Sequence, residues 1–179
     1  MRITPVDEHG NLFQVQDLVP ESLLDKINST TWLDLPHSVT EQQKHFVRKN
    51  IVDEQLMWNN EWRDSLYLLM TTFCQQTNIK LRPWHKTNWW IDEPGFCCPI
   101  HLDEPGVKVG LQMFWSGNKN LGTTFYNSNN LQDVRKNFEF IPNSGYITFN
   151  QSNTWHAMME PIPKDTFRLT SFTWFDPVK

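Results

Sequence analysis

Residues 97–126 decide the fold class, and they read CCPIHLDEPGVKVGLQMFWSGNKNLGTTFY. Three short runs of β-prone residues lie in this stretch, at 97–102, 108–115 and 123–126. Turn-forming residues separate these runs, first Glu104-Pro105-Gly106 and then the segment 116–122. Runs this short, with no helical pattern between them, predict antiparallel strands joined by turns.

The same texture extends from residue 81 to residue 175. Eight β-prone runs occur there, and in chain order they are 81–91, 97–102, 108–115, 123–126, 138–141, 146–150, 154–159 and 167–175. Eight antiparallel strands without crossover helices predict a mainly β fold, a double-stranded β-helix of the jelly-roll or cupin-like type.

The N-terminal part predicts helices that pack on one sheet of this core. After a strand-like run at 12–19, Pro20-Glu21-Ser22 begins a first helix, because proline suits a first turn and acids favour the N-terminal end. Asn59 or Asn60 caps a second helix that ends near Gln76. An apolar stripe at helical spacing, which predicts core packing, consists of Trp62, Leu66, Leu69, Met70 and Phe73.

Between these helices the chain predicts a loop at 30–55, with a short helix at 41–47. The polar segments 36–55 and 116–120 are candidates for loops that cover a site. We see no linker, so residues 1–179 predict one domain, with helical support at about 20–78 and a jelly-roll core at about 81–175.

Composition excludes several classes of function. The net charge of −4 and the lack of a basic cluster argue against nucleic acid as the main partner. Three cysteines make a disulfide framework improbable and favour a reducing compartment. The N-terminus has no apolar run that would suit a signal peptide or a membrane span, so we expect a cytoplasmic protein without a membrane partner.

His101 and Asp103 are candidate metal ligands, because side chains two apart on a strand point to one face. His156, in a later β-prone run, is the candidate third ligand. Two histidines and one carboxylate form the facial triad of non-haem Fe(II) oxygenases. Arg168 follows His156 by twelve residues and is a candidate anchor for an acidic cosubstrate. The alternatives are a chance triplet, a satisfied core histidine and a surface arginine.

These motifs together resemble the 2-oxoglutarate/Fe(II)-dependent oxygenases, and within them the compact prolyl-hydroxylase-like branch of phage and bacterial type. The resemblance rests on the spacing from His101-x-Asp103 to His156 and then Arg168, on Pro94-Gly95, and on the segments 121–126 and 167–170. It covers residues 88–175 and the opening at 13–27.

The resemblance implies Fe(II), 2-oxoglutarate and O₂, with hydroxylation of a C–H bond and release of succinate and CO₂. It assigns the C5 carboxylate of 2-oxoglutarate to Arg168, with Thr170 on the same strand face where many members carry serine. The strand that often supplies a tyrosine to this carboxylate has no tyrosine here, and Gln112 is the candidate substitute. Asp103 disfavours the halogenase branch, which lacks that ligand.

The substrate stays open between a peptide or protein, with proline as one candidate, and a small molecule. A second hypothesis is a non-oxygenase cupin-like metal-binding protein or isomerase, which would need no Arg168. The position of Arg168 relative to the metal therefore discriminates the two. His85 is a further candidate for the pocket wall. Several tryptophans are expected mainly in the core, with a stacking wall for substrate as the alternative, and these are Trp89, Trp90, Trp115, Trp155 and Trp174.

Overall fold

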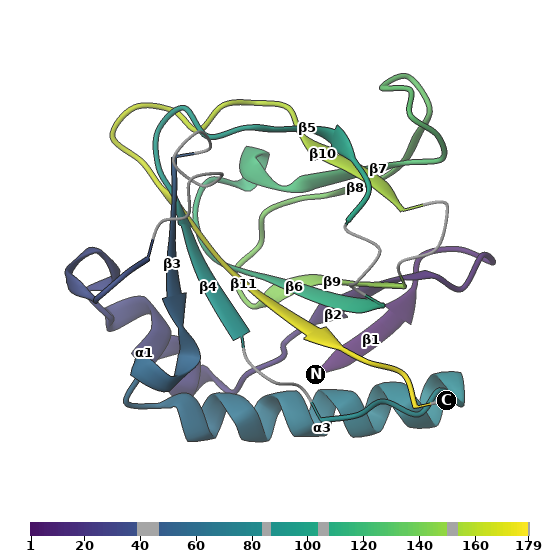
Figure 1. Ribbon diagram of the computed structural model, residues 1–179, viewed down its shortest axis with the longest axis horizontal. Coiled ribbons are helices and arrows are strands. Elements are labelled where there is room, and N and C mark those ends of the chain that lie inside the picture. The colour runs from purple at the N-terminus through teal and green to yellow at the C-terminus, as the bar shows by residue number, and fades with distance from the viewer. Residues whose placement is uncertain (39–46, 84–86, 104–107, 150–153, 179) are drawn as a thin grey trace.

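A computed structural model describes residues 1–38, 47–83, 87–103, 108–149 and 154–178. Two antiparallel sheets face each other, and a long helix lies along the outer side of the larger sheet (Figure 1). The fold is mainly β, and the predicted jelly-roll class is confirmed.

The larger sheet has the strand order β1-β2-β9-β6-β11-β4-β3, and the smaller has the order β5-β10-β7-β8. The strands of the larger sheet are β1 (Arg2–Pro5), β2 (Leu12–Gln16), β3 (Arg48–Val52), β4 (Thr87–Asp92), β6 (Val109–Ser116), β9 (Ser144–Phe149) and β11 (Arg168–Phe175). Those of the smaller sheet are β5 (Cys98–His101), β7 (Thr123–Tyr126), β8 (Val134–Phe138) and β10 (Trp155–Met158).

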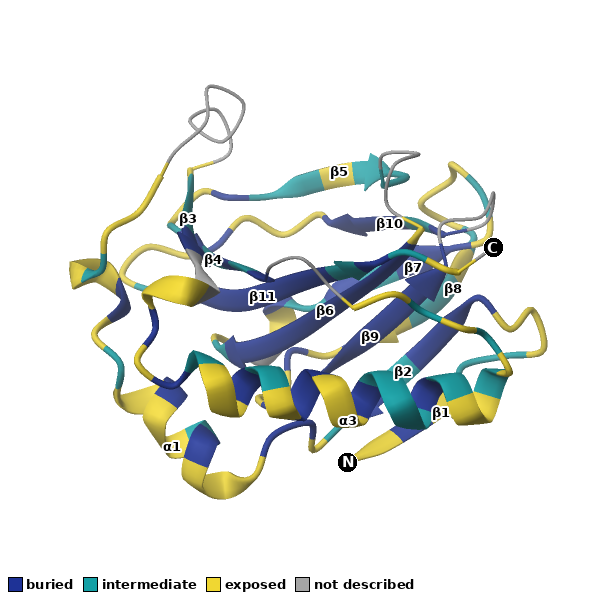
Figure 2. Cartoon of the chain, turned by 60° about the horizontal axis from the view of Figure 1, so that its bottom comes forward, coloured by how far each residue is buried: buried dark blue, intermediate teal, exposed yellow. Residues whose placement is uncertain are grey.

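Two α-helices support the larger sheet, α1 (Glu21–Ser29) and α3 (Asn59–Thr77), as the sequence predicts. Figure 2 shows the buried side of α3 turned toward the sheet and its exposed side toward solvent. The predicted stripe is buried except for Met70, which is partly exposed. The asparagine cap is wrong, because the residue that caps α3 is Trp58 and its side chain makes no capping hydrogen bond.

Strand alternation divides the interior into two cores. Trp89 and Ile91 of β4 point to the outer core, which packs on the helices. Trp90 and Asp92 then point to the inner side, between the two sheets. An inner core of mainly aromatic side chains, including Phe114, fills part of that space. The inner face therefore supplies the side chains between the two sheets, and the helices pack on the opposite face.

Several predicted boundaries differ from the structure. The sequence pattern missed β1 and β3, and it placed β8 at 138–141, where Phe138 is instead the last strand residue. Within the run at 81–91, the described strand is β4, which begins at Thr87, and Leu81 forms an isolated bridge to Pro177. The short helix predicted at 41–47 lies outside the described residues except for Val47.

Two short 3-10 segments, η1 (Trp32–Asp34) and η2 (Asp53–Gln55), lie within the region predicted as a loop, and η3 (Lys119–Leu121) precedes β7.

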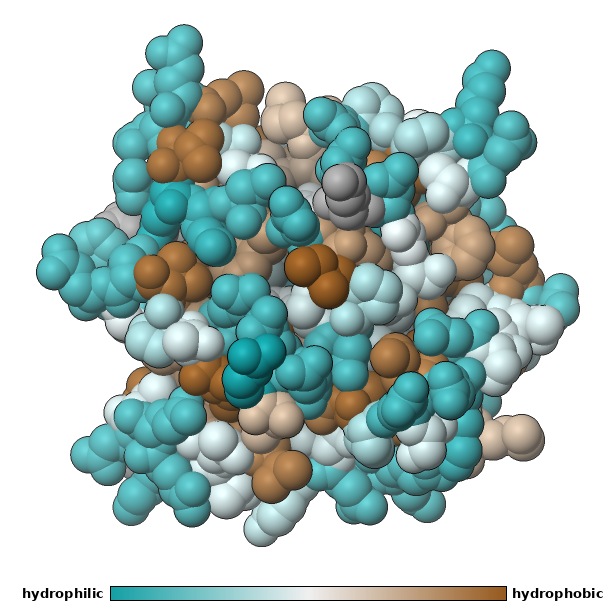
Figure 3. Space-filling model, turned by 180° about the vertical axis from the view of Figure 1, so that it is seen from behind, coloured by the Kyte–Doolittle hydropathy of each residue, from teal (hydrophilic) through white to brown (hydrophobic). Residues whose placement is uncertain are grey.

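Figure 3 shows hydrophilic side chains over most of one face, with hydrophobic ones scattered among them. Among the described residues, neither helix is both long and apolar enough to cross a membrane.

Candidate metal centre

Three candidate ligands meet at one end of the β5–β10 strand pair in the smaller sheet. His101 is the last residue of β5, Asp103 follows two residues later, and His156 lies on β10. His101 and His156 are register partners across the β5–β10 pair. One ligand atom from each of the three residues lies within 4.8 Å of the others. The structure thus brings together the three residues that the sequence singled out.

Backbone carbonyls fix the orientation of both imidazole rings. Nδ1 of His101 lies 2.8 Å from the carbonyl oxygen of Pro99, and Nδ1 of His156 lies 2.9 Å from that of Thr154. A carbonyl oxygen only accepts hydrogen bonds, so Nδ1 donates in both rings. In the neutral rings, the lone pair is then on Nε2, which faces the cluster: Nε2 of His156 is 3.7 Å from Oδ1 of Asp103.

The two histidines differ in their electrostatic surroundings. Burial is the largest effect on His156 and lowers its pKa, which favours the neutral form that binds metals. At His101 the contact with Cys98, whose Sγ lies 3.5 Å from Nδ1, is the largest effect and raises the pKa to about 9, so a metal ion that binds Nε2 would displace a proton from this ring. Phe125 stacks on His156 with ring centroids 5.3 Å apart and restricts the tilt of its ring.

The cluster opens into a small cavity of about 110 Å³ between the two sheets. Its wall combines ionisable, polar and apolar side chains from eight strands and from the residues that follow β5. The lining residues are Arg48, Trp90, Cys98, His101, Asp103, Gln112, Thr123, Tyr146, His156, Ala157, Met158, Arg168 and Phe172.

Arg168 lies in the same cavity as the three candidate ligands. It is only 3% exposed and begins β11 on the inner side of the sheet. Its Nε and Nη2 donate to Oδ2 of Asp92 at 2.9 and 2.7 Å, and its Nη1 donates to the carbonyl oxygen of Leu121 at 3.1 Å. The sulfur of Met158 also lies 2.7 Å from Nη1. Arg168 is therefore an inward-facing, held side chain and not a surface charge.

A second arginine, which the sequence reading missed, converges on the same carboxylate. Nε of Arg48 donates to Oδ1 of Asp92, and Nη2 of Arg48 donates to Oδ2 at 3.1 Å. Burial would raise the pKa of Asp92, but the charges and hydrogen bonds of Arg48 and Arg168 outweigh it and hold that pKa below its usual value. Asp92 is consequently an anion at neutral pH.

The other two predicted cosubstrate residues occupy different positions. Gln112 lines the cavity, and its Oε1 accepts a hydrogen bond of 3.2 Å from the hydroxyl of Tyr146. Thr170 is fully buried and lies outside the described cavity wall, and its Oγ1 has no hydrogen-bond partner among the described residues. Both side chains belong to the inner face, as Arg168 does.

Tyr146 is a cavity residue that the sequence analysis did not single out, and it comes from a strand other than the one that carries Gln112. It enters from β9, directly opposite Gln112 of β6, and its hydroxyl also lies 3.4 Å from Oγ1 of Thr123. Burial raises the pKa of Tyr146, so the phenol stays neutral and available as a donor. The sequence did place a strand at 146–150, but only the pairing register brings its first residue into the pocket.

The remaining candidates divide between core and cavity. Trp89 and Trp115 are fully buried in the outer core, whereas Trp90 lines the cavity and stacks on Phe172 with ring centroids 5.2 Å apart. His85 lies outside the described residues.

The donor set fits a divalent transition metal. Two imidazole nitrogens and one carboxylate oxygen within 4.8 Å suit Fe(II) in the facial arrangement, and they leave the cavity side open for further ligands. A closed structural zinc site would instead use four protein ligands. Cys98 is near enough to contact His101, but it does not belong to the cluster that the described residues form.

No family model and no curated protein matches the sequence. Known structures do match the fold. The viral collagen prolyl hydroxylase of Paramecium bursaria Chlorella virus-1, solved as a complex with 2-oxoglutarate, aligns with a TM-score of 0.67 and 12% identity over 94% of this chain and 97% of that chain.

Two further matches differ in what they bind. A prolyl hydroxylase from Trichoplax adhaerens, in complex with a peptide of the hypoxia-inducible factor, has a TM-score of 0.67 at 12% identity and covers 92% of this chain and 83% of its own. HygX from Streptomyces hygroscopicus, with nickel and 2-oxoglutarate bound, has a TM-score of 0.68 at 8% identity and covers 94% and 83%. The chain therefore has the fold of these oxygenase structures over nearly its full length, in agreement with the resemblance read from its motifs.

Proposed function

We propose that this protein is a 2-oxoglutarate- and O₂-dependent Fe(II) oxygenase that hydroxylates a C–H bond and releases succinate and CO₂. One observation carries the proposal: the cluster of His101, Asp103 and His156 shares a single small cavity with the buried guanidinium of Arg168. The shared fold of known 2-oxoglutarate-binding proteins supports the same reading.

His101, Asp103 and His156 would hold Fe(II) through Nε2 of each ring and a carboxylate oxygen. The iron, with 2-oxoglutarate and O₂, supplies the oxidising chemistry for hydroxylation. The protein orients the two histidine ligands through the carbonyls of Pro99 and Thr154.

Arg168 would bind the C5 carboxylate of 2-oxoglutarate, because a planar guanidinium suits a carboxylate. Asp92 holds the guanidinium in place before the cosubstrate arrives. Gln112 and Tyr146 form a polar wall on the same cavity and would contact the cosubstrate from the side of β6 and β9. Thr170 stays a candidate for a hydroxyl contact, since its Oγ1 has no other partner among the described residues.

The substrate that we favour is a peptide, with a prolyl residue as the first candidate, and a small molecule is the alternative. The peptide complex of the Trichoplax prolyl hydroxylase supports this order. In this chain, Trp90 and Phe172 present stacked rings at the cavity and offer an apolar surface to a ring such as that of proline. We also propose that residues 1–179 form a single domain. The three cysteines are free thiols, which suits a reducing compartment, and we therefore propose a cytoplasmic location.

The competing function is a cupin-like metal-binding protein or isomerase without a cosubstrate. It predicts no role for an inward-facing arginine, whereas Arg168 lies in the cavity. The two functions separate in one assay, in which protein is mixed with Fe(II), 2-oxoglutarate and O₂ and succinate is quantified by NMR, with and without proline-containing peptides.

We expect slow succinate formation by the protein alone and faster formation with a substrate, whose mass then rises by one oxygen atom. His101→Ala and Asp103→Ala should abolish succinate formation and leave the unfolding temperature of the metal-free protein close to that of the wild type. Succinate formation that persists in both variants would refute the proposal. Metal binding without any succinate would instead favour the cupin-like function.

A further inference from the structure

The buried carboxylate of Asp92 is shared by two arginines that come from different strands. Asp92 is fully buried on β4, Arg168 approaches from β11, and Arg48 approaches from the neighbouring edge strand β3. Nη2 of both arginines lies within hydrogen-bond distance of the same atom, Oδ2, at 3.1 Å for Arg48 and 2.7 Å for Arg168. The two guanidinium groups therefore converge at one wall of the cavity.

The charges at this wall do not balance. Two guanidinium groups carry two positive charges, and Asp92 supplies one negative charge. The neighbouring acid, Glu93, is paired with Lys49 at 2.7 Å. Asp92 itself does not line the cavity. Among the described residues that do, the one carboxylate is that of Asp103, which belongs to the candidate metal cluster. A net positive charge therefore remains in a site of low dielectric, where it attracts one further carboxylate.

Arg168 alone has few donors left for that carboxylate. Of its five N–H groups, two bind Asp92, one binds the carbonyl oxygen of Leu121, and one is directed at the sulfur of Met158. A two-pronged grip by Arg168 would first have to displace Met158.

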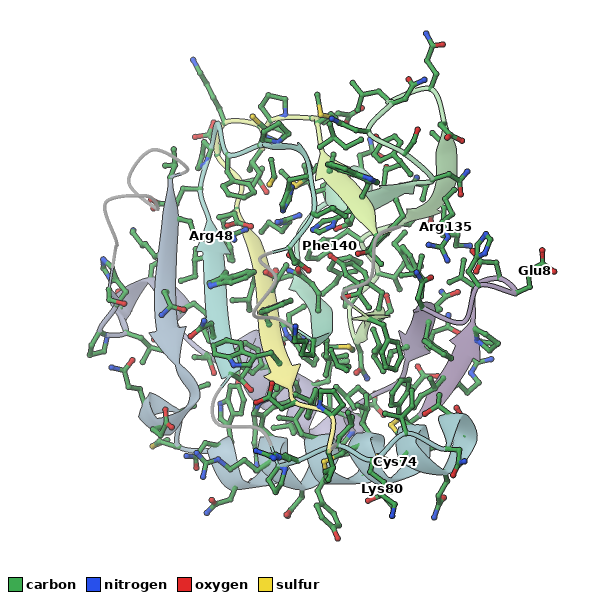
Figure 4. All side chains as sticks on the ribbon, turned by 45° about the vertical axis from the view of Figure 1, so that its right-hand side comes forward. Glu8, Arg48, Cys74, Lys80, Arg135 and Phe140 are labelled. Carbon is green, nitrogen blue, oxygen red and sulfur yellow. The ribbon has the colours of Figure 1, made fainter. Side chains whose placement is uncertain are left out.

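Arg48 has the donors that Arg168 lacks. Its Nε and Nη2 bind Asp92, and its Nη1 has no hydrogen-bond partner among the described residues. The guanidinium lies between the rings of Trp90 and Phe96, 4.1 and 4.4 Å from their centroids, so its orientation is fixed. Figure 4 shows Arg48 reaching from β3 toward β4, and the side chain lines the cavity together with Arg168.

We propose that Arg48 is a second cosubstrate-binding residue, which grips the C5 carboxylate of 2-oxoglutarate jointly with Arg168. The inference rests on the proposed function and adds to it a two-arginine clamp with Asp92 as its fixed centre. In this clamp, Nη1 of Arg48 and the remaining N–H of Nη2 of Arg168 donate to the carboxylate.

The test is an anaerobic titration of the Fe(II)-loaded protein with two 2-oxo acids, followed through the visible charge-transfer band. The first acid is 2-oxoglutarate, and the second is 2-oxopentanoate, which has the same number of carbon atoms but no C5 carboxylate. Arg48→Met keeps an apolar side chain between Trp90 and Phe96 and leaves Asp92 paired with Arg168. Lys26→Met, which removes an exposed positive charge from α1 outside the cavity, is the control.

We expect Arg48→Met to weaken 2-oxoglutarate about tenfold or more, from the loss of charge-assisted hydrogen bonds, and to change 2-oxopentanoate affinity less than about twofold. Arg48→Lys should recover part of the loss, and Lys26→Met should match the wild type with both acids. Equal 2-oxoglutarate affinity in the wild type and Arg48→Met would overturn the clamp, as would equal weakening of both acids. If the wild type gives no band with either acid, the proposed function itself fails.

Discussion

Replacing Asp92 by asparagine is the sharpest test of the charge arrangement in the interior. The substitution keeps the size of the side chain but removes the charge that two arginines share, and it turns an amide NH₂ group toward at least one guanidinium. Loss of one partner from a buried ion pair costs about 3–5 kcal/mol. For a chain of this length, that corresponds to a fall in unfolding temperature of roughly 6–20 °C.

The stabilisation that Asp92 provides depends on pH, because it requires the ionised carboxylate. The arginines depress the pKa of Asp92 in the folded protein, so the carboxylate stabilises the fold at every pH above its unfolded pKa of about 3.9. That stabilisation is lost as the pH falls through the folded pKa. The stability difference between wild type and Asp92→Asn should therefore be constant between pH 6 and 8 and should shrink below about pH 4.

Urea unfolding followed by tryptophan fluorescence, at pH 7 and at stepwise lower pH, measures the difference. Asp17→Asn is the control, because Asp17 forms an exposed pair with Arg2 at 3.5 Å and should cost no more than about 1 kcal/mol. A cost of Asp92→Asn below about 1 kcal/mol at pH 7 would refute the argument. So would a difference that stays the same when the solution is acidified.

Two further substitutions test the polar wall and the strand pairing behind it. Gly145→Ala should unfold the protein or lower its free energy of unfolding in urea by at least about 3 kcal/mol, because a Cβ at Gly145 would lie 1.9 Å from the carbonyl oxygen of Gln112. A variant as stable as the wild type would contradict the pairing register of β6 and β9. Tyr146→Phe leaves Oε1 of Gln112 without its donor and should cost about 1–3 kcal/mol, whereas an unchanged free energy of unfolding would show that the hydrogen bond contributes nothing.

The grouping of the three candidate metal ligands could be predicted from the sequence because much of its pattern is local. His101 and Asp103 are two residues apart, and side chains at that spacing share a side of an extended chain. His156 required only the assumption that its run pairs in the same sheet, and the β5–β10 register makes it the partner of His101. Arg168 lines the same cavity because it lies on the inner face of β11, where every second side chain points between the two sheets.

Arg48 and Tyr146 could not be predicted, because long-range pairing decides their positions. Strand β3 begins Arg48-Lys49-Asn50, which has little intrinsic β preference, and it becomes a strand by pairing with β4 at the edge of the sheet. Tyr146 is recognisable as a strand residue, but its meeting with Gln112 depends on the register of β9 against β6. Neither pairing register can be predicted from a local sequence pattern.

The buried ion pairs of Asp92 with two arginines could not be predicted from the sequence. An acid at the end of a β-prone run, before Glu93 and Pro94, has the composition of a solvated turn. Only the pairing of β4 with both β3 and β11 places arginines on its two sides and makes its burial tolerable.

The most direct test of the central claim is an anaerobic titration of metal-free wild-type protein, first with Fe(II) and then with 2-oxoglutarate. Our account predicts a visible charge-transfer band that appears only after both additions, saturates at one 2-oxoglutarate per protein, and is absent in Asp103→Ala. Iron that binds to the cluster without giving this band, at any 2-oxoglutarate concentration, would contradict it.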